Sequence, residues 1–285
     1  GMAHVFDGET GNHLHSFALP EDFHYFTGYG KSVSGVPDVN GDGYGDIVVA
    51  GPKEVVFVFD GATGSRLFPL SPPANEYGKS FGNIVIGIQD LNGNGSGDII
   101  VASEANPSAG DFDPSKARVY IYDGSTAEVI STLLPPPGNP QTFASTLALV
   151  PDTNGDGVEE IISGQFLYDP TNGELIRTMK TRGAIGFPLK PTMVAGLSDV
   201  TGDGRGDILI GMSDQRYTKL DFGIAFLFDG VSGQFLRAFI SPNAENGDQF
   251  GFSLTGLDDL NADGLGEICI GAPGQLSNSG VTPSG

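Results

Sequence analysis

The chain has 285 residues, of which 39% are hydrophobic, and a formal net charge of −21 at pH 7. This length is enough for one large all-β domain or two ordinary domains, and the hydrophobic content excludes a chain that stays disordered. The negative charge excludes the basic surface that binds nucleic acids and anionic membranes, and no apolar run is long enough to insert into a bilayer.

The first elements along the chain are short strands joined by tight turns, as the 44 glycines and 19 prolines indicate. Val5 and Phe6 end a strand that is followed by Asp7-Gly8 and by a returning strand up to Phe17. The aspartate can bond its own backbone while the glycine takes a positive φ, which is typical of a hairpin turn. Similar strands with an aspartate turn recur at residues 57–61, 120–124, 167–169 and 226–230.

A second pattern alternates with these hairpins. The intervals between its copies are 52, 62, 47 and 60 residues, which suit a unit of four short strands with their turns. An apolar segment precedes each copy and a β-branched run follows it, as expected for buried strands. The pattern reads Asp-x-Asn-x-Asp-Gly or a close variant, and its copies begin at Asp38, Asp90, Asp152, Asp199 and Asp259.

We name the four predicted strands of a unit A to D in chain order. The acidic loop joins A to B, the aspartate turn joins C to D, and no helix is predicted. The chain begins with strands C and D, residues 4–17, and finishes with strands A and B, residues 252–271. Together these two ends supply one complete unit, and a ring of sheets that closes in this way leaves no long exposed edge.

The sequence therefore predicts a single all-β domain over residues 1–285. The predicted fold is a five-bladed β-propeller of four-stranded antiparallel blades, with a closing blade shared by the N- and C-terminal strands. A fragment of a larger ring is the alternative, and it would leave two open edges. The predicted blades span about residues 29–71, 77–134, 143–180, 187–240 and 250–285, the last completed by residues 1–19.

Short motifs at the ends of the units match a known family. Phe250-Gly251 precedes the last acidic loop and Gly271-Ala272-Pro273 follows it, with looser copies at Tyr29-Gly30, Tyr77-Gly78 and Phe81-Gly82. The units resemble the FG-GAP repeats of integrin α-chain propellers. Those propellers have seven blades, and this sequence also lacks the rest of an integrin subunit, so integrin function is not carried over. A closer analogy is to bacterial-type FG-GAP modules appended to secreted or surface proteins.

The acidic loops have the oxygen donors of calcium sites. Calcium takes six to eight oxygens, and a short loop can supply them from alternate positions. In the first loop, Asp38, Asn40 and Asp42 offer side chains at positions 1, 3 and 5, the Tyr44 carbonyl stands at position 7, and Asp46 closes the site at position 9. The corresponding residues of the other loops are Asp90, Asn92, Asn94, Ser96 and Asp98; Asp152, Asn154, Asp156, Val158 and Glu160; Asp199, Thr201, Asp203, Arg205 and Asp207; and Asp259, Asn261, Asp263, Leu265 and Glu267.

These donors predict up to five Ca²⁺ ions with a structural role, and ordinary aspartate–glycine turns are the alternative. The second loop has only two carboxylates, Asp90 and Asp98, so it is predicted to bind most weakly. Oxygen-only ligation favours calcium over zinc or copper, and a strand at position 12 excludes an EF-hand. At ten times its dissociation constant, each ion would stabilise the fold by about 1.4 kcal/mol. Affinity in the millimolar range would imply an extracellular or cell-surface location.

Smaller motifs are interpreted as structural. Residues 205–207 spell Arg-Gly-Asp, but the aspartate is needed at position 9 of the fourth loop. Asn94 begins a glycosylation sequon, yet a glycan would remove a predicted ligand. His13 and His15 are expected to share one solvated face of a strand, and Cys269 is expected to be a buried strand thiol.

The loops at the opposite rim, which join B to C and D to A, have the more variable lengths and suit ligand binding. No nucleophile elbow, Cys-His pair, phosphate loop or zinc motif is present. The predicted function is a non-catalytic binding or adhesion module for a protein or glycan, monomeric or part of a larger surface protein. A polysaccharide lyase-like enzyme and a purely structural spacer are the alternatives. The residues predicted to form the ligand face are His24, Tyr25, Tyr77, Asp111, Phe112, Asp113, Arg216 and Tyr217.

Overall fold

The computed structural model describes residues 1–18, 28–51, 54–74, 80–105, 113–138, 142–180, 189–213 and 222–275. Regular structure in these ranges consists of β-strands and one 3₁₀ turn, Pro114–Lys116, which confirms the all-β class. The chain divides into two compact units. Unit 1 comprises Gly1–Ser145 with Pro170–Glu174, and unit 2 comprises Thr146–Asp169 with Leu175–Gly285.

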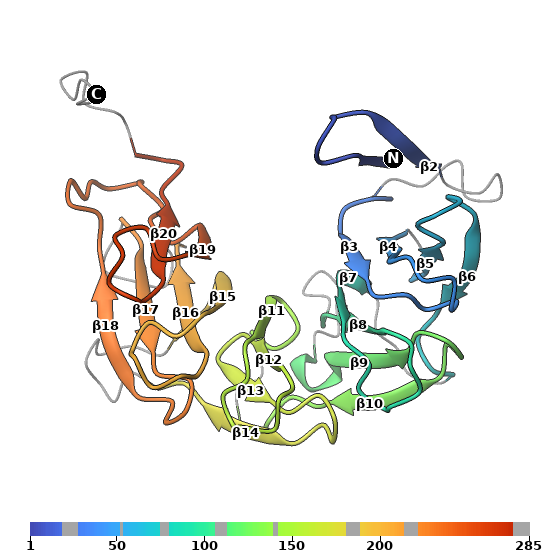
Figure 1. Cartoon of the computed structure of the whole chain (residues 1–285). Coiled ribbons are helices and arrows are strands. Elements are labelled where there is room, and N and C mark those ends of the chain that lie inside the picture. Colours follow the sequence, from blue (N-terminus) through green and yellow to red (C-terminus); the bar gives the residue numbers. More distant parts are fainter. Residues whose placement is uncertain are drawn as a thin grey trace. The chain divides into compact units, whose positions relative to one another are not determined.

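Unit 1 contains a two-stranded and two four-stranded antiparallel sheets, each with its strands in chain order (Figure 1). The hairpin is β1 (Met2–Phe6) and β2 (His13–Ala18). The next sheet is β3 (Val33–Val36), β4 (Asp46–Ala50), β5 (Val56–Phe59) and β6 (Arg66–Leu70). The last is β7 (Phe81–Ile88), β8 (Asp98–Ser103), β9 (Arg118–Asp123) and β10 (Val129–Leu133).

The strands of two further four-stranded sheets and a second hairpin lie in unit 2, again antiparallel and in chain order. The first sheet is β11 (Leu147–Val150), β12 (Glu160–Ser163), β13 (Phe166–Tyr168) and β14 (Leu175–Thr178). The second is β15 (Met193–Leu197), β16 (Asp207–Met212), β17 (Ile224–Phe228) and β18 (Phe235–Phe239). The hairpin is β19 (Ser253–Leu257) and β20 (Glu267–Gly271).

Each unit has its core between neighbouring sheets, because successive side chains of a strand point to opposite faces. In β4, Val48 and Ala50 pack with residues of the β7–β10 sheet, whereas Val49 packs with Phe17 of the first hairpin. In β16 of unit 2, Leu209 faces the β19–β20 hairpin while the residues on either side of it face the β11–β14 sheet. Strands buried on both faces explain the short, continuous β-branched runs in the sequence.

The four complete sheets share one register between their second and third strands. The residue that follows loop position 9 pairs with the aromatic residue that precedes the turn aspartate. This register places the acidic loop and the aspartate turn at the same end of every sheet, as predicted. The four pairs are Ile47↔Phe59, Ile99↔Tyr122, Ile161↔Tyr168 and Ile208↔Phe228.

The FG and GAP elements have a shared structural role. Gly251 has a φ of +87°, and its N–H donates to the Gly271 carbonyl at 3.0 Å, which links the two elements of the same unit. Gly30 donates to Ala50 at 2.9 Å in the same way. A Cβ on Gly211 would lie 2.1 Å from the Gly251 oxygen, so the neighbouring strand needs glycine for this close approach.

The two terminal hairpins are separate two-stranded sheets, so the blade count and the shared closing blade remain predictions. The expectation that Cys269 is buried is wrong, because its side chain is exposed. Its counterparts Val48, Ile100 and Leu209 are fully buried, since each lies in the second strand of a four-stranded sheet with a neighbour on both faces. Cys269 lies instead in β20, which pairs only with β19 among the described strands.

Candidate metal sites in the acidic loops

The aspartate at position 1 organises each loop. Asp38 Oδ1 accepts the N–H of Asn40 at 3.1 Å and of Gly41 at 2.6 Å, and its Oδ2 accepts that of Gly43 at 2.7 Å. Gly41 and Gly43 have φ values of +82° and +89°, which glycine adopts without strain. The N–H groups, that of Gly43 above all, hold the pKa of Asp38 below its usual range. The same turn forms at Asp90, Asp152, Asp199 and Asp259.

The carboxylate at position 9 has a second role that the sequence analysis missed. Asp46 is only 2% exposed, and it accepts the N–H of Val39 at 2.8 Å and of Gly61 at 3.0 Å. It therefore links the A–B loop to the C–D turn of the same four-stranded sheet. Burial raises its pKa. Asp98 and Asp207 make the same two bonds, and burial raises the pKa of Asp98 to about 6.

Glycine follows the turn aspartate because the loop and the turn approach closely. A Cβ on Gly61 would lie 1.9 Å from the carbonyl oxygen of Gly45, at loop position 8. A Cβ on Gly124 or Gly230 would lie at a similar distance from the carbonyl oxygen of the position-8 glycine in its own sheet. The pairing of an acidic loop with an Asp-Gly turn in four of the five repeats was the sequence signal that could have revealed this hydrogen-bonded link.

The third loop departs from this arrangement. Its turn carries Pro170, which has no N–H to donate, and position 8 is Glu159. Glu160 at position 9 is 1% exposed and accepts the Thr153 N–H at 2.7 Å through Oε2. Its Oε1 is buried without a hydrogen-bond partner in the described structure. Burial of this carboxylate raises its pKa.

The third loop also gathers its acidic groups. One carboxylate oxygen each of Asp152, Asp156 and Glu160 lies within 4.8 Å of the others. A buried carboxylate oxygen without a partner is costly, and a divalent cation held by three carboxylates would offset that cost. The donor set therefore fits the predicted calcium.

The fifth loop brings Asp259, Asp263 and Glu267 within the same distance. Glu267 is less buried than the position-9 residues of the complete sheets, and its Oε1 accepts the Asn261 side-chain amide at 2.7 Å. Ala262 stands at position 4, where the other loops have glycine, and has a φ of +64°. Loops one, two and four form no such three-residue acidic cluster among the described residues.

The second loop satisfies its polar groups internally. The side-chain amides of Asn92 and Asn94 both donate to Asp123 Oδ2 at 2.8 Å. Asp123 is the turn aspartate of the same unit and is 8% exposed. These bonds give both amides a partner without a cation, and the weakest calcium binding at this loop stays a prediction.

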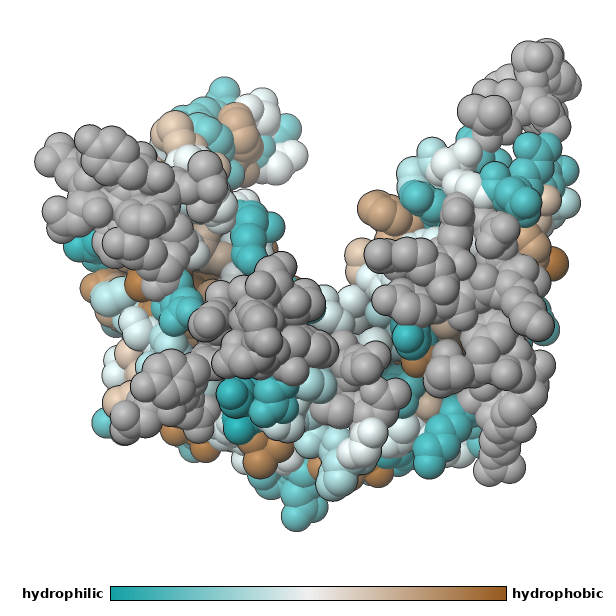
Figure 2. Space-filling model, turned by 180° about the vertical axis from the view of Figure 1, so that it is seen from behind, coloured by the Kyte–Doolittle hydropathy of each residue, from teal (hydrophilic) through white to brown (hydrophobic). Residues whose placement is uncertain are grey.

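The residue at position 7 donates its N–H to the side chain at position 5 in every loop, as Tyr44 does to Asp42 at 2.8 Å. Its carbonyl role stays a prediction, as does ligation by the residues at position 3. In the other four loops, the residue at position 7 whose N–H donates to the position-5 side chain is Ser96, Val158, Arg205 or Leu265. Tyr44 is 63% exposed. On the face drawn in Figure 2, apolar surface occurs as separate patches among polar ones.

Most of the predicted ligand face lies outside the described residues. This applies to His24, Tyr25, Tyr77, Asp111, Phe112, Arg216 and Tyr217. Asp113 is described, and it caps the short 3₁₀ turn by accepting the Ser115 N–H at 3.0 Å. The structure therefore shows a local structural role for Asp113, and its part in ligand binding stays a prediction.

The prediction that His13 and His15 share a face is wrong. The register of β1 and β2 shifts so that Phe6 pairs with His13 while Val5 pairs with His15. This irregularity turns the two rings to opposite sides. His13 bonds the exposed Ser16 hydroxyl at 2.7 Å, whereas His15 lies 3.2 Å from the Gly61 carbonyl.

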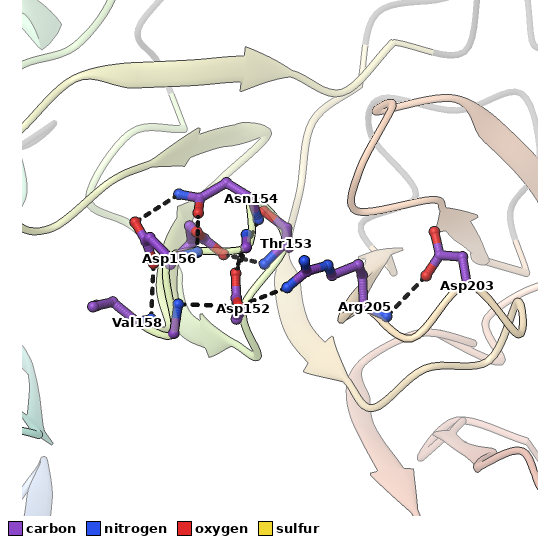
Figure 3. A network of polar contacts seen from close by, with 10 residues as sticks. Asp152, Thr153, Asn154, Asp156, Val158, Asp203 and Arg205 are labelled. Atoms are coloured by element: carbon purple, nitrogen blue, oxygen red, sulfur yellow. Dashed lines mark hydrogen bonds and ion pairs between the residues drawn. The ribbon is translucent and has the colours of Figure 1, made fainter.

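The buried Asp207 explains why Arg-Gly-Asp at residues 205–207 does not act as an exposed tripeptide. Asp207 is 0% exposed, and a Cβ on Gly206 would lie 2.2 Å from the Pro151 carbonyl oxygen. Arg205 forms an ion pair with Asp152, as Figure 3 shows. All three residues are therefore used inside the loop region.

The sheets that pack face to face and the repeated acidic loops define a repeat protein of the β-propeller type. No family model matches the chain. It is 28% identical over 158 residues to integrin alpha-4 of Xenopus laevis, which is 50% of this chain and 14% of the relative. It is 30% identical over 138 residues to integrin alpha-V of Gallus gallus, with shares of 44% and 13%.

Integrin alpha pat-2 of Caenorhabditis briggsae is 26% identical over 145 residues, with shares of 43% and 12%. The chain thus contains an integrin α-like FG-GAP region, which confirms the resemblance stated from the motifs. It spans only about one eighth of the length of these relatives.

Among solved structures, the rhamnogalacturonan lyase YesW matches with a TM-score of 0.52 and 17% identity. The match covers 84% of this chain and 45% of that one, and it concerns the fold alone. Within the described residues, no helix has the length and apolar character needed to span a membrane.

Proposed function

We propose that this chain is a calcium-stabilised, non-catalytic binding or adhesion module of an extracellular or cell-surface protein. The integrin α-like region over about half of the chain supports the adhesion-related class. The observation that carries the cation part is the third loop, where three carboxylates converge and a buried Glu160 oxygen has no partner among the described residues.

Calcium would be held by the carboxylates at positions 1, 5 and 9, with further oxygens from positions 3 and 7. The third and fifth loops are the strongest candidates because their acidic groups already lie together. A bound ion would neutralise buried negative charge and fix the loop against its own sheet. Up to five ions are proposed, with the second loop the weakest.

The ligand would be a protein or a glycan, bound by the loops that join B to C and D to A. These loops vary in length, and they join the strand ends that lie opposite the acidic loops. Such variable loops on a rigid sheet scaffold are common binding surfaces. The chain would act as a monomer or as part of a larger surface protein.

The proposed closing blade unites the two terminal hairpins into a fifth four-stranded sheet. The register common to the four complete sheets would place Ile268 opposite Phe6 and Cys269 opposite Val5. A Cβ on Gly8 would meet no atom within 4 Å, whereas the corresponding Gly61 lies against its position-8 partner. Gly8 and Glu267 would then complete the same tie between loop and turn.

A cysteine cross-link tests this blade. Val5→Cys should form an intramolecular disulfide with native Cys269 under mild oxidation, because directly opposed strand residues have Cβ atoms about 5 Å apart. His4→Cys is the control, since its side chain would point to the opposite face. A disulfide-linked dimer or no cross-link in the Val5→Cys variant would contradict closure within one chain.

The binding function is tested in two steps. Thermal unfolding in EDTA and in millimolar calcium, with metal counting by mass spectrometry, should show a rise in unfolding temperature and several bound ions. The calcium-loaded chain is then screened against glycan and extracellular-matrix protein arrays. Saturable binding without turnover supports the proposal, and an unchanged unfolding temperature with no bound ion contradicts its cation part.

The same calcium-loaded chain is incubated with rhamnogalacturonan, and unsaturated products are followed by ultraviolet absorbance. Product formation would identify the chain as a lyase and overturn the non-catalytic proposal. No binding and no product would leave the structural spacer as the better interpretation.

A further inference from the structure

Arg205 is the only basic residue in the five acidic loops. It stands at position 7 of the fourth loop, yet its guanidinium reaches the third loop (Figure 3). The distance from Arg205 Nη1 to Asp152 Oδ2 is 2.7 Å, and the side chains are 38% and 24% exposed. An ion pair therefore joins the loops of two neighbouring sheets in unit 2.

The backbone of the third loop leaves room for this side chain. Gly155 stands at position 4, and a Cβ there would lie 2.6 Å from Arg205 Nη2. The next pair of loops has a similar arrangement, since Leu265 is the nearest side chain to a Cβ built on Gly202, at 4.0 Å. In these two pairs of unit 2, the side chain at position 7 of one loop thus lies against position 4 of the preceding loop. Only at Arg205 does this place carry a positive charge.

The charge arrives where the third loop concentrates its acidic groups. Asp152 is one of the three clustered carboxylates, together with Asp156 and the buried Glu160. Asp152 Oδ2 accepts both the Arg205 guanidinium and the Gly157 N–H at 3.1 Å, so two donors already use this oxygen. In the first loop, the matching oxygen of Asp38 accepts only one N–H among the described residues, that of Gly43.

We propose that Arg205 is a built-in counter-cation that sets the calcium affinity of the third loop. In the cation-free protein it neutralises Asp152 and links the two neighbouring loops. A divalent cation in the third loop must share Asp152 with the guanidinium or displace it, and the two positive charges repel. Calcium occupancy therefore weakens the link between the loops. This inference rests on the proposed calcium binding.

The size of the effect follows from the charges. A unit charge about 6 Å from a divalent ion, in a medium close to water, changes the ion's affinity by about tenfold. Arg205→Gln removes the charge and keeps the position-7 carbonyl, so it should tighten one calcium site by about tenfold. Arg205→Lys keeps the charge without the planar fork and should retain nearly the original affinity.

The experiment is a double-mutant cycle on the whole chain. Calcium is titrated calorimetrically into the original protein, Arg205→Gln, Arg205→Lys, Asp156→Asn and the Arg205→Gln/Asp156→Asn double variant. Asp156→Asn removes one of the three clustered carboxylates without removing a partner of Arg205, and it should take the third site out of the titrated calcium range. The tightening caused by Arg205→Gln should therefore disappear in the Asp156→Asn background. In EDTA, Arg205→Gln should lower the unfolding temperature, because the link to Asp152 is lost.

The outcomes separate this inference from the proposed calcium binding. The role of Arg205 alone is overturned if Arg205→Gln leaves the calcium affinity unchanged or lowers it. It is also overturned if Arg205→Gln raises the affinity equally in the Asp156→Asn background. Binding that appears only in the Arg205→Gln variant supports it in its strongest form. Absence of binding in every variant overturns the calcium proposal and this inference together.

Discussion

The second and third acidic loops have similar sequences but satisfy their buried polar groups in different ways. In the second loop, Asp98 accepts two N–H groups, from Leu91 and Gly124, and two asparagine amides donate to Asp123. In the third loop, Glu160 keeps one buried oxygen without a partner in the described part of the chain. Whether the position-9 carboxylate finds partners for both of its oxygens therefore depends on the turn opposite the loop as well as on the loop itself.

The largest effect is expected when the hydrogen bonds of the position-9 carboxylate are removed in the cation-free protein. Asp98→Ala leaves two buried N–H groups without an acceptor and should lower the free energy of unfolding by about 3 kcal/mol. Glu160→Ala frees only the Thr153 N–H and removes an unpaired buried oxygen, so it should cost about half as much. Urea unfolding in EDTA measures both. An equal or larger cost for Glu160→Ala would contradict the comparison.

A reciprocal exchange at position 5 should transfer the need for calcium. Asn94→Asp removes an amide donor to Asp123 and adds a third carboxylate, so the second loop should become less stable in EDTA and respond to calcium. Asp156→Asn should weaken the response of the third loop by up to about 1.4 kcal/mol at calcium ten times its dissociation constant. The difference between unfolding free energies with calcium and with EDTA tests both. The prediction fails if Asn94→Asp adds no calcium dependence.

The fifth loop extends the comparison, since it has the acidic cluster of the third loop but alanine at position 4. Ala262 has a φ of +64°, a conformation that costs a side chain about 1 kcal/mol relative to glycine. Ala262→Gly should therefore stabilise the chain by about that amount, equally in EDTA and in calcium. Gly41→Ala in the first loop is the matched reverse change and should destabilise. Unequal effects in the two conditions would show that the backbone and the cation are coupled.

The smallest effect concerns an unpaired buried oxygen outside the acidic loops. Tyr29 is 4% exposed, and its hydroxyl has no partner among the described residues. Tyr29→Phe removes this oxygen and should stabilise by less than about 1 kcal/mol, independently of calcium. A calcium-dependent effect would show that unpaired oxygens alone do not identify a cation site.

The same tyrosine gives a pH dependence of known sign. Burial raises the pKa of Tyr29 to about 12, whereas an unfolded tyrosine ionises near pH 10. Its contribution to stability is therefore complete below about pH 10 and is lost as the pH rises toward 12. Comparison of unfolding for the original protein and Tyr29→Phe over this range isolates that loss.

Sequence patterns predicted the all-β class, the four-stranded sheets and the positions of the loops, because strand period and turn residues act locally. They did not predict the Arg205–Asp152 ion pair, which joins loops about fifty residues apart and depends on how two sheets pack. They also missed the opposite directions of His13 and His15, because a register shift in a hairpin leaves no clear mark in composition. The exposure of Cys269 depends on neighbouring strands, and local pattern cannot supply that information.

The bond from the position-9 carboxylate to the turn glycine lies wholly within one four-stranded sheet, as for Asp46 and Gly61. Three of the four complete sheets, those with Asp46, Asp98 or Asp207 at position 9, therefore have a hydrogen bond of this kind between the acidic loop and the turn. The segments that join the last strand of one sheet to the first strand of the next lie outside the stretch of chain between the two partners of each bond. New chain termini introduced there by circular permutation would keep both partners of every such bond on one continuous stretch of chain, whereas termini placed in a B–C loop would separate them.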